Sequence, residues 1–155
     1  MLKKFIILAI LFVFPLTAFG GKKAPVFSVR DGNGRVYTLS QFRGRTLILF
    51  FFTFECPHCR RAMPYIEKLH KKGIPVLGIA FSTRYGELDS KIKRAGVTFP
   101  VAVGTKRIAD AYGIKGVPTT FVISPGRIIV MRKTGERGAG EIYDKMMKSQ
   151  KRSYY

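Results

Sequence analysis

The two cysteines of this 155-residue chain, Cys56 and Cys59, lie two residues apart where an apolar run gives way to a helical pattern. Residues 47–52 contain no polar side chain, which is typical of a strand buried on both faces of a sheet. Cys56 then stands where a helix can begin, and Pro57 suits the first helical turn. Apolar residues recur at helical spacing at Ala62, Ile66 and Leu69. The sequence therefore predicts a central strand followed by a helix whose N-terminus carries both thiols.

That placement favours thiol–disulfide exchange. The unpaired N–H groups and the positive end of the dipole at a helix N-terminus both stabilise a thiolate. We expect Cys56 to be the exposed sulfur that attacks first and Cys59, one turn later, to be the resolving sulfur. A structural disulfide across so short a loop would remove little chain entropy. A zinc site would need two further ligands, for which only His58 and His70 are on offer. Redox catalysis without a metal or cofactor is the favoured interpretation.

The stretch at residues 50–64 resembles the active site of the thioredoxin superfamily, and a second match, Tyr-Gly-Ile-Lys-Gly-Val-Pro-Thr-Thr-Phe, lies at residues 112–121. The resemblance implies that Pro118 is a cis-proline facing the cysteines and that the backbone of Val117 pairs with an extended substrate segment. Pro64 matches a helix-kinking proline of the family. Within the superfamily the chain is most similar to the secreted TlpA/ResA-like branch, from about residue 24 to residue 148.

The remaining patterns predict the order of elements. Two apolar segments flank Asp-Gly-Asn-Gly at residues 31–34, a hairpin signal, and a helical turn follows at 39–44. Further strands are predicted at 75–81, 101–103, 119–123 and 128–133, and helices at 85–95, 106–112 and 140–150. This order predicts an α/β fold with a mixed central sheet and helices on both faces. The resemblance implies a thioredoxin-like fold over one domain, residues 21–155, with an N-terminal β-hairpin and an αβ insertion before the cis-proline.

Residues 1–20 predict a secretory signal peptide. Lys3 and Lys4 precede an apolar stretch at 5–14, Pro15 interrupts it, and Ala-Phe-Gly at 18–20 is a suitable cleavage site. An uncleaved N-terminal anchor is the alternative, although the apolar stretch is short for a spanning helix. Export would place the thiols in the periplasm or at the outer face of the cytoplasmic membrane, where disulfides form readily.

The chain carries 28 Lys and Arg against 9 Asp and Glu, a formal charge of +19. This balance favours acidic partners or an anionic membrane surface, although a generally solvated basic surface is the favoured explanation over a specific docking site. No nucleic-acid-binding motif accompanies the charge. The family resemblance implies protein substrates that carry cysteines or disulfides, and an upstream redox partner at the membrane.

Several positions depart from the family pattern. Glu55 stands where the family usually has Trp, and it would oppose thiolate formation at Cys56 if it pointed inward, so we expect it to face solvent. Ala62 replaces the Glu of many relatives, which leaves the proton of Cys59 to His58 or to water. The pair Pro57-His58 is the one found in DsbA, an oxidant of the same superfamily. We therefore expect Pro57, His58 and Glu55 to tune the reactive thiol.

Together these patterns predict an exported thiol–disulfide oxidoreductase that acts as a reductant, for example in cytochrome c maturation. A DsbA-like oxidant is one alternative. A peroxiredoxin-like peroxidase is another: Thr53 and Cys56 have the spacing of that family, but Leu49 stands where it has proline. A copper-binding protein could use two thiolates and a histidine, although no Met-rich or His-rich tract is present.

Overall fold

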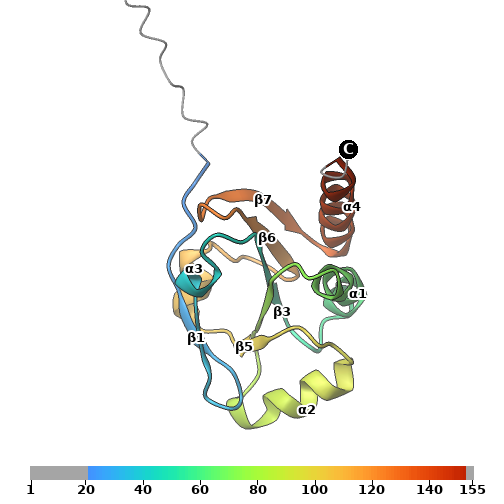
Figure 1. Ribbon diagram of the computed structural model, residues 1–155. Helices are drawn as coiled ribbons and strands as arrows, with labels where there is room; N and C mark the ends of the chain where they lie inside the picture. The colour runs from blue at the N-terminus through green and yellow to red at the C-terminus, as the bar shows by residue number, and fades with distance from the viewer. Residues whose placement is uncertain (1–20, 153–155) are drawn as a thin grey trace, which may run out of the picture.

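A five-stranded sheet with the order β5-β4-β3-β6-β7 forms the centre of the computed structural model, which describes residues 21–152 (Figure 1). The predicted signal peptide at residues 1–20 lies outside the described residues. Along the chain the elements are β1 (Ser28–Arg30), β2 (Val36–Thr38), η1 (Leu39–Phe42), β3 (Leu47–Phe52), α1 (Pro57–Lys71), β4 (Val76–Ala80), α2 (Tyr85–Ala95), β5 (Val101–Val103), α3 (Lys106–Ala111), β6 (Thr119–Ile123), β7 (Ile129–Thr134) and α4 (Glu136–Arg152). Among these described helices none is long and apolar enough to cross a membrane.

Strand β3 is the middle strand, and both of its faces are buried. Its six side chains are all inaccessible to solvent, and they alternate between two apolar clusters. Phe50 and Phe52 point into the cluster beneath α1, whereas Leu49 and Phe51 point into the cluster on the other face. The uninterrupted apolar run in the sequence follows from this position, because a central strand covered on both sides has no solvent face.

Helices cover both faces of the sheet. Helices α1, α2 and α4 pack on one side, and α3 packs on the other together with the β1–β2 hairpin and η1 (Figure 1). Strands β3, β4 and β5 run parallel, whereas β6 pairs antiparallel with both β3 and β7. The predicted mixed sheet, the helices on both faces and the N-terminal hairpin are therefore confirmed. Helix α2 and strand β5 form the αβ segment that precedes β6.

The last helix begins earlier than the sequence pattern indicates. It starts at Glu136 rather than near residue 140, so Gly138 and Gly140 lie inside it. A Cβ atom at Gly138 would come within 2.7 Å of the Lys133 Cβ on β7, and one at Gly140 would lie 3.5 Å from the Tyr65 ring on α1. The absence of a side chain at these two positions allows α4 to approach the sheet and α1 closely.

Candidate active site

Cys56 is the N-cap residue of α1, directly after the loop that follows β3. Its backbone is extended, with φ −74° and ψ 121°, and Pro57 occupies the first helical turn. The Cys56 sulfur accepts a hydrogen bond from the backbone N–H of Cys59 at 3.4 Å. The thiol thus takes the place that a Ser or Asp side chain has at many helix N-termini, and it is partly exposed.

The surroundings of Cys56 favour its thiolate. Partial burial opposes the charge, but hydrogen bonds from Cys59 and from the backbone N–H of His58, together with the nearby Arg60 guanidinium, lower the pKa of the Cys56 thiol below its ordinary value of 9.0. Because a thiolate is the form that attacks a disulfide, this site makes Cys56 the more reactive thiol at neutral pH.

Cys59 has the opposite environment. It lies within the first turn of α1, is fully buried, and belongs to the apolar cluster between α1 and the sheet. Burial, with a smaller contribution from the neighbouring Cys56, raises the pKa of the Cys59 thiol to about 12. Both cysteines are free thiols in this structure. The pair therefore combines an accessible, acidified sulfur with an inaccessible sulfur that keeps its proton.

Pro118 lies at the same end of the sheet as Cys56. Thr119 pairs with Phe51, so the residue before Thr119 is level with the end of β3, from which the Cys56 loop departs. The Val117–Pro118 peptide bond is cis. The Pro118 carbonyl accepts a hydrogen bond from the Gly135 N–H at 2.8 Å. Val117 is half-buried and packs against the apolar cluster that Cys56 also contacts.

The His58 ring points toward the start of α4. Its Nδ1 lies 3.0 Å from a Glu136 carboxylate oxygen and 2.9 Å from a guanidinium nitrogen of Arg61. Arg61 donates to the same carboxylate oxygen at 2.6 Å. A protonated Nδ1 donates to Glu136, whereas an unprotonated Nδ1 accepts from Arg61. The ring is 64% exposed, and Arg61, followed by His58, lowers the pKa of the Glu136 carboxyl.

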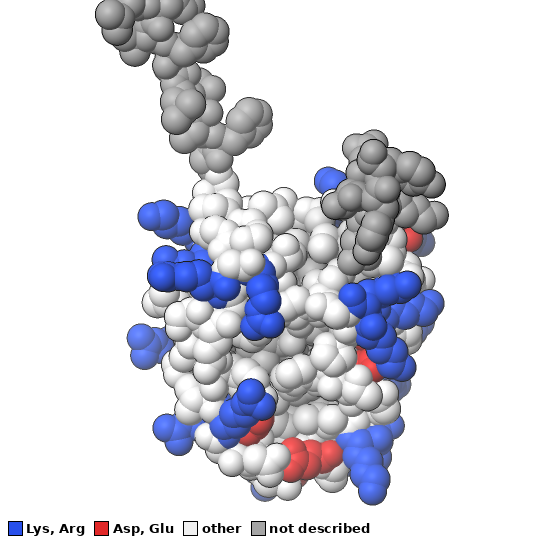
Figure 2. All heavy atoms as spheres, in the orientation of Figure 1, with Lys and Arg blue, Asp and Glu red and all other residues white. Residues whose placement is uncertain are grey.

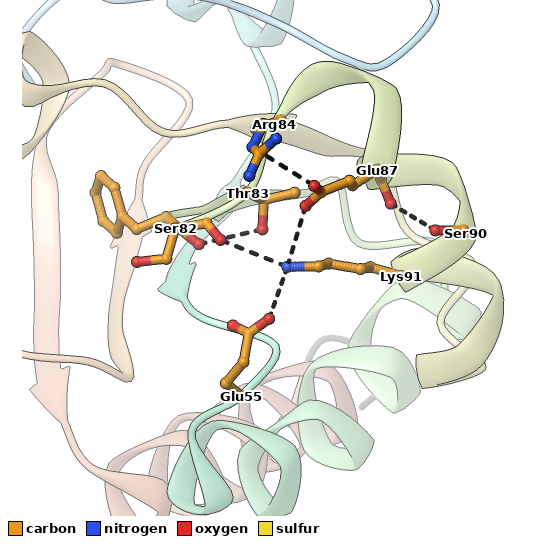
Figure 3. A network of polar contacts seen from close by, with 8 residues as sticks. Glu55, Ser82, Thr83, Arg84, Glu87, Ser90 and Lys91 are labelled. Carbon is orange, nitrogen blue, oxygen red and sulfur yellow. Dashed lines mark hydrogen bonds and ion pairs between the residues drawn. The ribbon is translucent and has the colours of Figure 1, made fainter.

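Glu55, which precedes the first cysteine, is bound to α2 (Figure 3). Its carboxylate accepts a hydrogen bond from the Lys91 amino group at 2.7 Å, and this bond is the main reason that the pKa of Glu55 is lowered. Lys91 also donates to the Ser82 carbonyl at 3.4 Å and lies 3.7 Å from Glu87. The Lys91 side chain is only 14% exposed. Lys91 therefore joins α2 to the loops that follow β3 and β4.

Sequence reasoning did not identify Lys91 or Glu136 as neighbours of the cysteine segment. Glu55 and Lys91 are 36 residues apart, and His58 and Glu136 are 78 residues apart, so no local pattern connects them. The contact of the His58 ring with Arg61 is local, because residues three apart on an exposed helix face are neighbours. The described residues contain no group of three or more His, Cys, Asp or Glu side chains that could hold a metal ion.

Residues 20–132 match the model of the AhpC/TSA family. The chain is 31% identical over 131 residues to the thiol-disulfide oxidoreductase ResA of Bacillus subtilis, covering 81% of this chain and 73% of that protein. It is 32% identical over 108 residues to ResA of Geobacillus thermodenitrificans, covering 66% of this chain and 62% of that protein.

The fold is also shared with solved structures. A putative thiol:disulfide interchange protein DsbE from Chlorobium tepidum superposes with a TM-score of 0.72 at 27% identity, covering 83% of this chain and 95% of that one. The cysteine pair lies at the start of the helix after the central strand, and the cis-proline is level with the end of that strand. The relatives of the chain are named as thiol-disulfide oxidoreductases, which is consistent with such a site. This chain belongs to the thioredoxin-like AhpC/TSA family, and within it to the thiol-disulfide oxidoreductases related to ResA.

Proposed function

We propose that the protein reduces disulfides in other proteins outside the cytoplasm, with Cys56 as the nucleophile and Cys59 as the resolving thiol. The observation that supports this most strongly is the contrast between the two thiols. One caps a helix and is partly exposed with a lowered pKa, and the other is buried with a raised pKa. Attack by an accessible thiolate and resolution by a protected thiol are the two steps of disulfide exchange.

In the first step the Cys56 thiolate attacks one sulfur of a substrate disulfide. A bond forms between Cys56 and that sulfur, and the other substrate sulfur leaves as a thiolate. Cys59 then loses its proton to solvent or to the departing thiolate and attacks the Cys56 sulfur. The second substrate thiolate is released and a Cys56–Cys59 disulfide forms. Two electrons pass from the protein to the substrate, and a dithiol partner at the membrane would return them.

The same geometry explains how the steps follow one another. Besides burial, the hydrogen bond and charge of the neighbouring Cys56 raise the pKa of Cys59. Once Cys56 is bound in a mixed disulfide, it carries no negative charge. The contribution of Cys56 to the raised pKa then disappears, so Cys59 becomes more acidic at the step in which it must attack.

We assign substrate contact to Val117 and Pro118 because of their place at the end of β3 next to the cysteine segment. An extended substrate segment would form backbone hydrogen bonds with Val117, and Pro118, which has no N–H, would present its ring to the sulfurs. Pro57, His58 and Glu55 are assigned to tuning of Cys56. Cytochrome c maturation, in which the cysteines of the apoprotein must be reduced, is the process we propose for these substrates.

The direction of exchange is tested by the reduction potential. The lowered pKa of Cys56 stabilises the reduced form above that pKa and so raises the potential relative to a protein with two ordinary thiols. We expect a value between the roughly −270 mV of thioredoxin and the roughly −120 mV of DsbA, measured by equilibration with glutathione. A value near that of DsbA would contradict the reductant proposal and favour an oxidant. In His58→Gly, a lowered potential would support tuning by the ring, and an unchanged potential would exclude it.

Peroxide reduction is the second candidate, because the matching family model is that of the AhpC/TSA family. A peroxidase and a disulfide reductase with this structure would both use Cys56, but only the reductase would transfer electrons to a protein disulfide. We expect rapid reduction of a protein disulfide and slow consumption of hydrogen peroxide by the same sample. The reverse order of rates would favour the peroxidase.

A further inference from the structure

A groove of about 570 Å³ runs between α1 and α2 and begins beside the reactive cysteine. Glu55, the residue before Cys56, forms part of its wall, and so does Arg60, the residue after Cys59. The groove continues along α1 to Glu67 and along α2 to its C-terminal end. A polypeptide whose cysteine is bonded to Cys56 therefore has this groove within reach of its neighbouring residues.

The groove has an apolar lining with its acidic groups already bound. Phe54, Met63 and Val97 are buried side chains that contribute its apolar surface. The Glu67 carboxylate accepts hydrogen bonds from the Thr98 N–H at 2.9 Å and from the Thr98 hydroxyl at 2.6 Å.

The other acid of the groove, Glu55, is held by Lys91 (Figure 3). The Lys91 amino group is therefore also occupied within the protein, since it donates hydrogen bonds to Glu55 and to the Ser82 carbonyl. Because Glu55 and Lys91 are paired with each other, neither offers a free charge to a side chain of the substrate.

Two cations of the groove remain available. Arg60 and Arg94 are exposed, and neither makes an ion pair with any acidic group of residues 21–152. Both lie near the reacting segment, because Arg60 directly follows Cys59 and Arg94 lines the same groove as Glu55. Guanidinium groups bind carboxylates through paired N–H donors.

We infer that this groove binds an acidic side chain of the protein substrate, on the segment that flanks the cysteine attacked by Cys56. The inference rests on the proposed disulfide exchange and adds to it a class of substrate. The apolar lining accommodates the aliphatic part of a Glu or Asp side chain, and Arg60 and Arg94 bind its carboxylate.

General attraction by a basic protein is the explanation to be separated from this one. Figure 2 shows that Lys and Arg side chains on the visible face lie mostly around its edge, with a largely uncharged centre, rather than in a single basic patch. General attraction would act over such a surface as a whole, so replacing any one exposed arginine would have a similar effect. Binding in the groove instead requires that the preference for an acidic substrate is lost only when an arginine of the groove is replaced.

The test uses the full 155-residue chain in reduced form and three oxidised peptides. The peptides are identical except that Glu, Gln or Lys stands next to one cysteine of their disulfide. The measured quantity is the second-order rate constant for reduction of each peptide, expressed as a ratio within one protein variant. Because the ratio compares two peptides on the same sample, any loss of folded protein cancels.

Wild-type protein is expected to reduce the Glu peptide about threefold faster than the Gln peptide, the effect of a single exposed ion pair. Arg94→Gln should abolish most of this preference, and Arg94→Glu should make the Lys peptide the better substrate. Arg107→Gln is the matched control, because Arg107 is an exposed arginine on α3, across the sheet from the groove. Its preference should equal that of the wild type.

Equal ratios in Arg94→Gln and Arg107→Gln would overturn the inference and assign any preference to overall charge. A wild-type protein with no preference for the Glu peptide would also overturn it. Hydroxyethyl disulfide, which is small and uncharged, distinguishes failure of the groove proposal from failure of the proposed disulfide exchange. If the wild type reduces it but shows no Glu preference, only the groove assignment fails; if it reduces neither that disulfide nor the peptides, the proposed exchange fails as well.

Discussion

The two thiols are predicted to differ strongly in their rate of alkylation. At pH 7 a thiol with a pKa of about 12 is ionised in roughly one molecule in 10⁵, against about one in 10² for the ordinary value of 9.0. The more basic thiolate is intrinsically a better nucleophile by a factor of about 20, since nucleophilicity rises with pKa with a slope of about 0.45. The net effect makes Cys59 roughly fiftyfold slower than an ordinary thiol.

The pKa of Cys56 is shifted in the opposite direction, which makes this thiol react faster than an ordinary one. Because its pKa lies below 9.0, the gain in thiolate at pH 7 exceeds the loss in nucleophilicity. We therefore expect iodoacetamide to modify Cys56 at least about fiftyfold faster than Cys59, and the burial of Cys59 increases this ratio further. The rate at Cys56 should level off above its lowered pKa, whereas the rate at Cys59 should still be rising at pH 10.

The assay follows both cysteines of the wild-type protein by mass spectrometry of their separate peptides, and it uses initial rates so that modification of one thiol does not alter the other. The control is the same reaction in concentrated urea, where the two rates should become equal. Native rates within about threefold of each other would refute the assignment of a protected, weakly acidic Cys59, because the pKa of about 12 requires a larger difference.

Three further changes test individual contacts. Pro118→Thr adds a backbone N–H beside the sulfurs and should prolong mixed disulfides about fivefold, the effect of one hydrogen bond, as measured by quenched-flow exchange. Glu67→Gln should lower the free energy of unfolding at pH 7 by about 1–2 kcal/mol in urea titrations. Burial opposes the charge of Glu67, but its hydrogen bonds to Thr98 lower the pKa of its carboxyl from 4.5. The stabilisation is therefore present above pH 4.5, and the difference in unfolding free energy between wild type and variant should disappear as the pH falls through the folded pKa. Lys91→Met should cost about 1 kcal/mol, and Lys91→Met with Glu55→Gln should cost less than the two single changes together.

The elements that carry the thiols were predictable because their signals are local. The apolar run of β3 occurs where a strand has helices on both sides, and Cys56 followed by proline marks the start of a helix. The hairpin turn is equally local, since Asp31 accepts hydrogen bonds from the N–H groups of Asn33 and Arg35. Residues close in sequence determine each of these features, so the sequence pattern is sufficient.

The partners of Glu55 and His58, the residues that we propose to tune Cys56, depend on tertiary packing and were not predictable. Glu55 is exposed, but its carboxylate binds Lys91 only because α2 packs beside the loop after β3. The His58 ring binds Glu136 only because α4 begins next to α1. That contact requires a helix starting at Glu136, four residues before the sequence pattern indicated one. The sequence pattern placed the start of the last helix at about residue 140, whereas Gly138 and Gly140 both lie inside α4, where they allow its close approach to β7 and α1.

The central claim is that Cys56 attacks and Cys59 resolves, and trapping of mixed disulfides tests it most directly. Cells that express the full chain as Cys59→Ala should accumulate proteins joined to it through Cys56, visible on non-reducing gels and identified after release by reductant. Cys56→Ala should accumulate none, because its remaining thiol is buried and weakly acidic. Equal trapping by the two variants, or trapping by Cys56→Ala alone, would contradict the account.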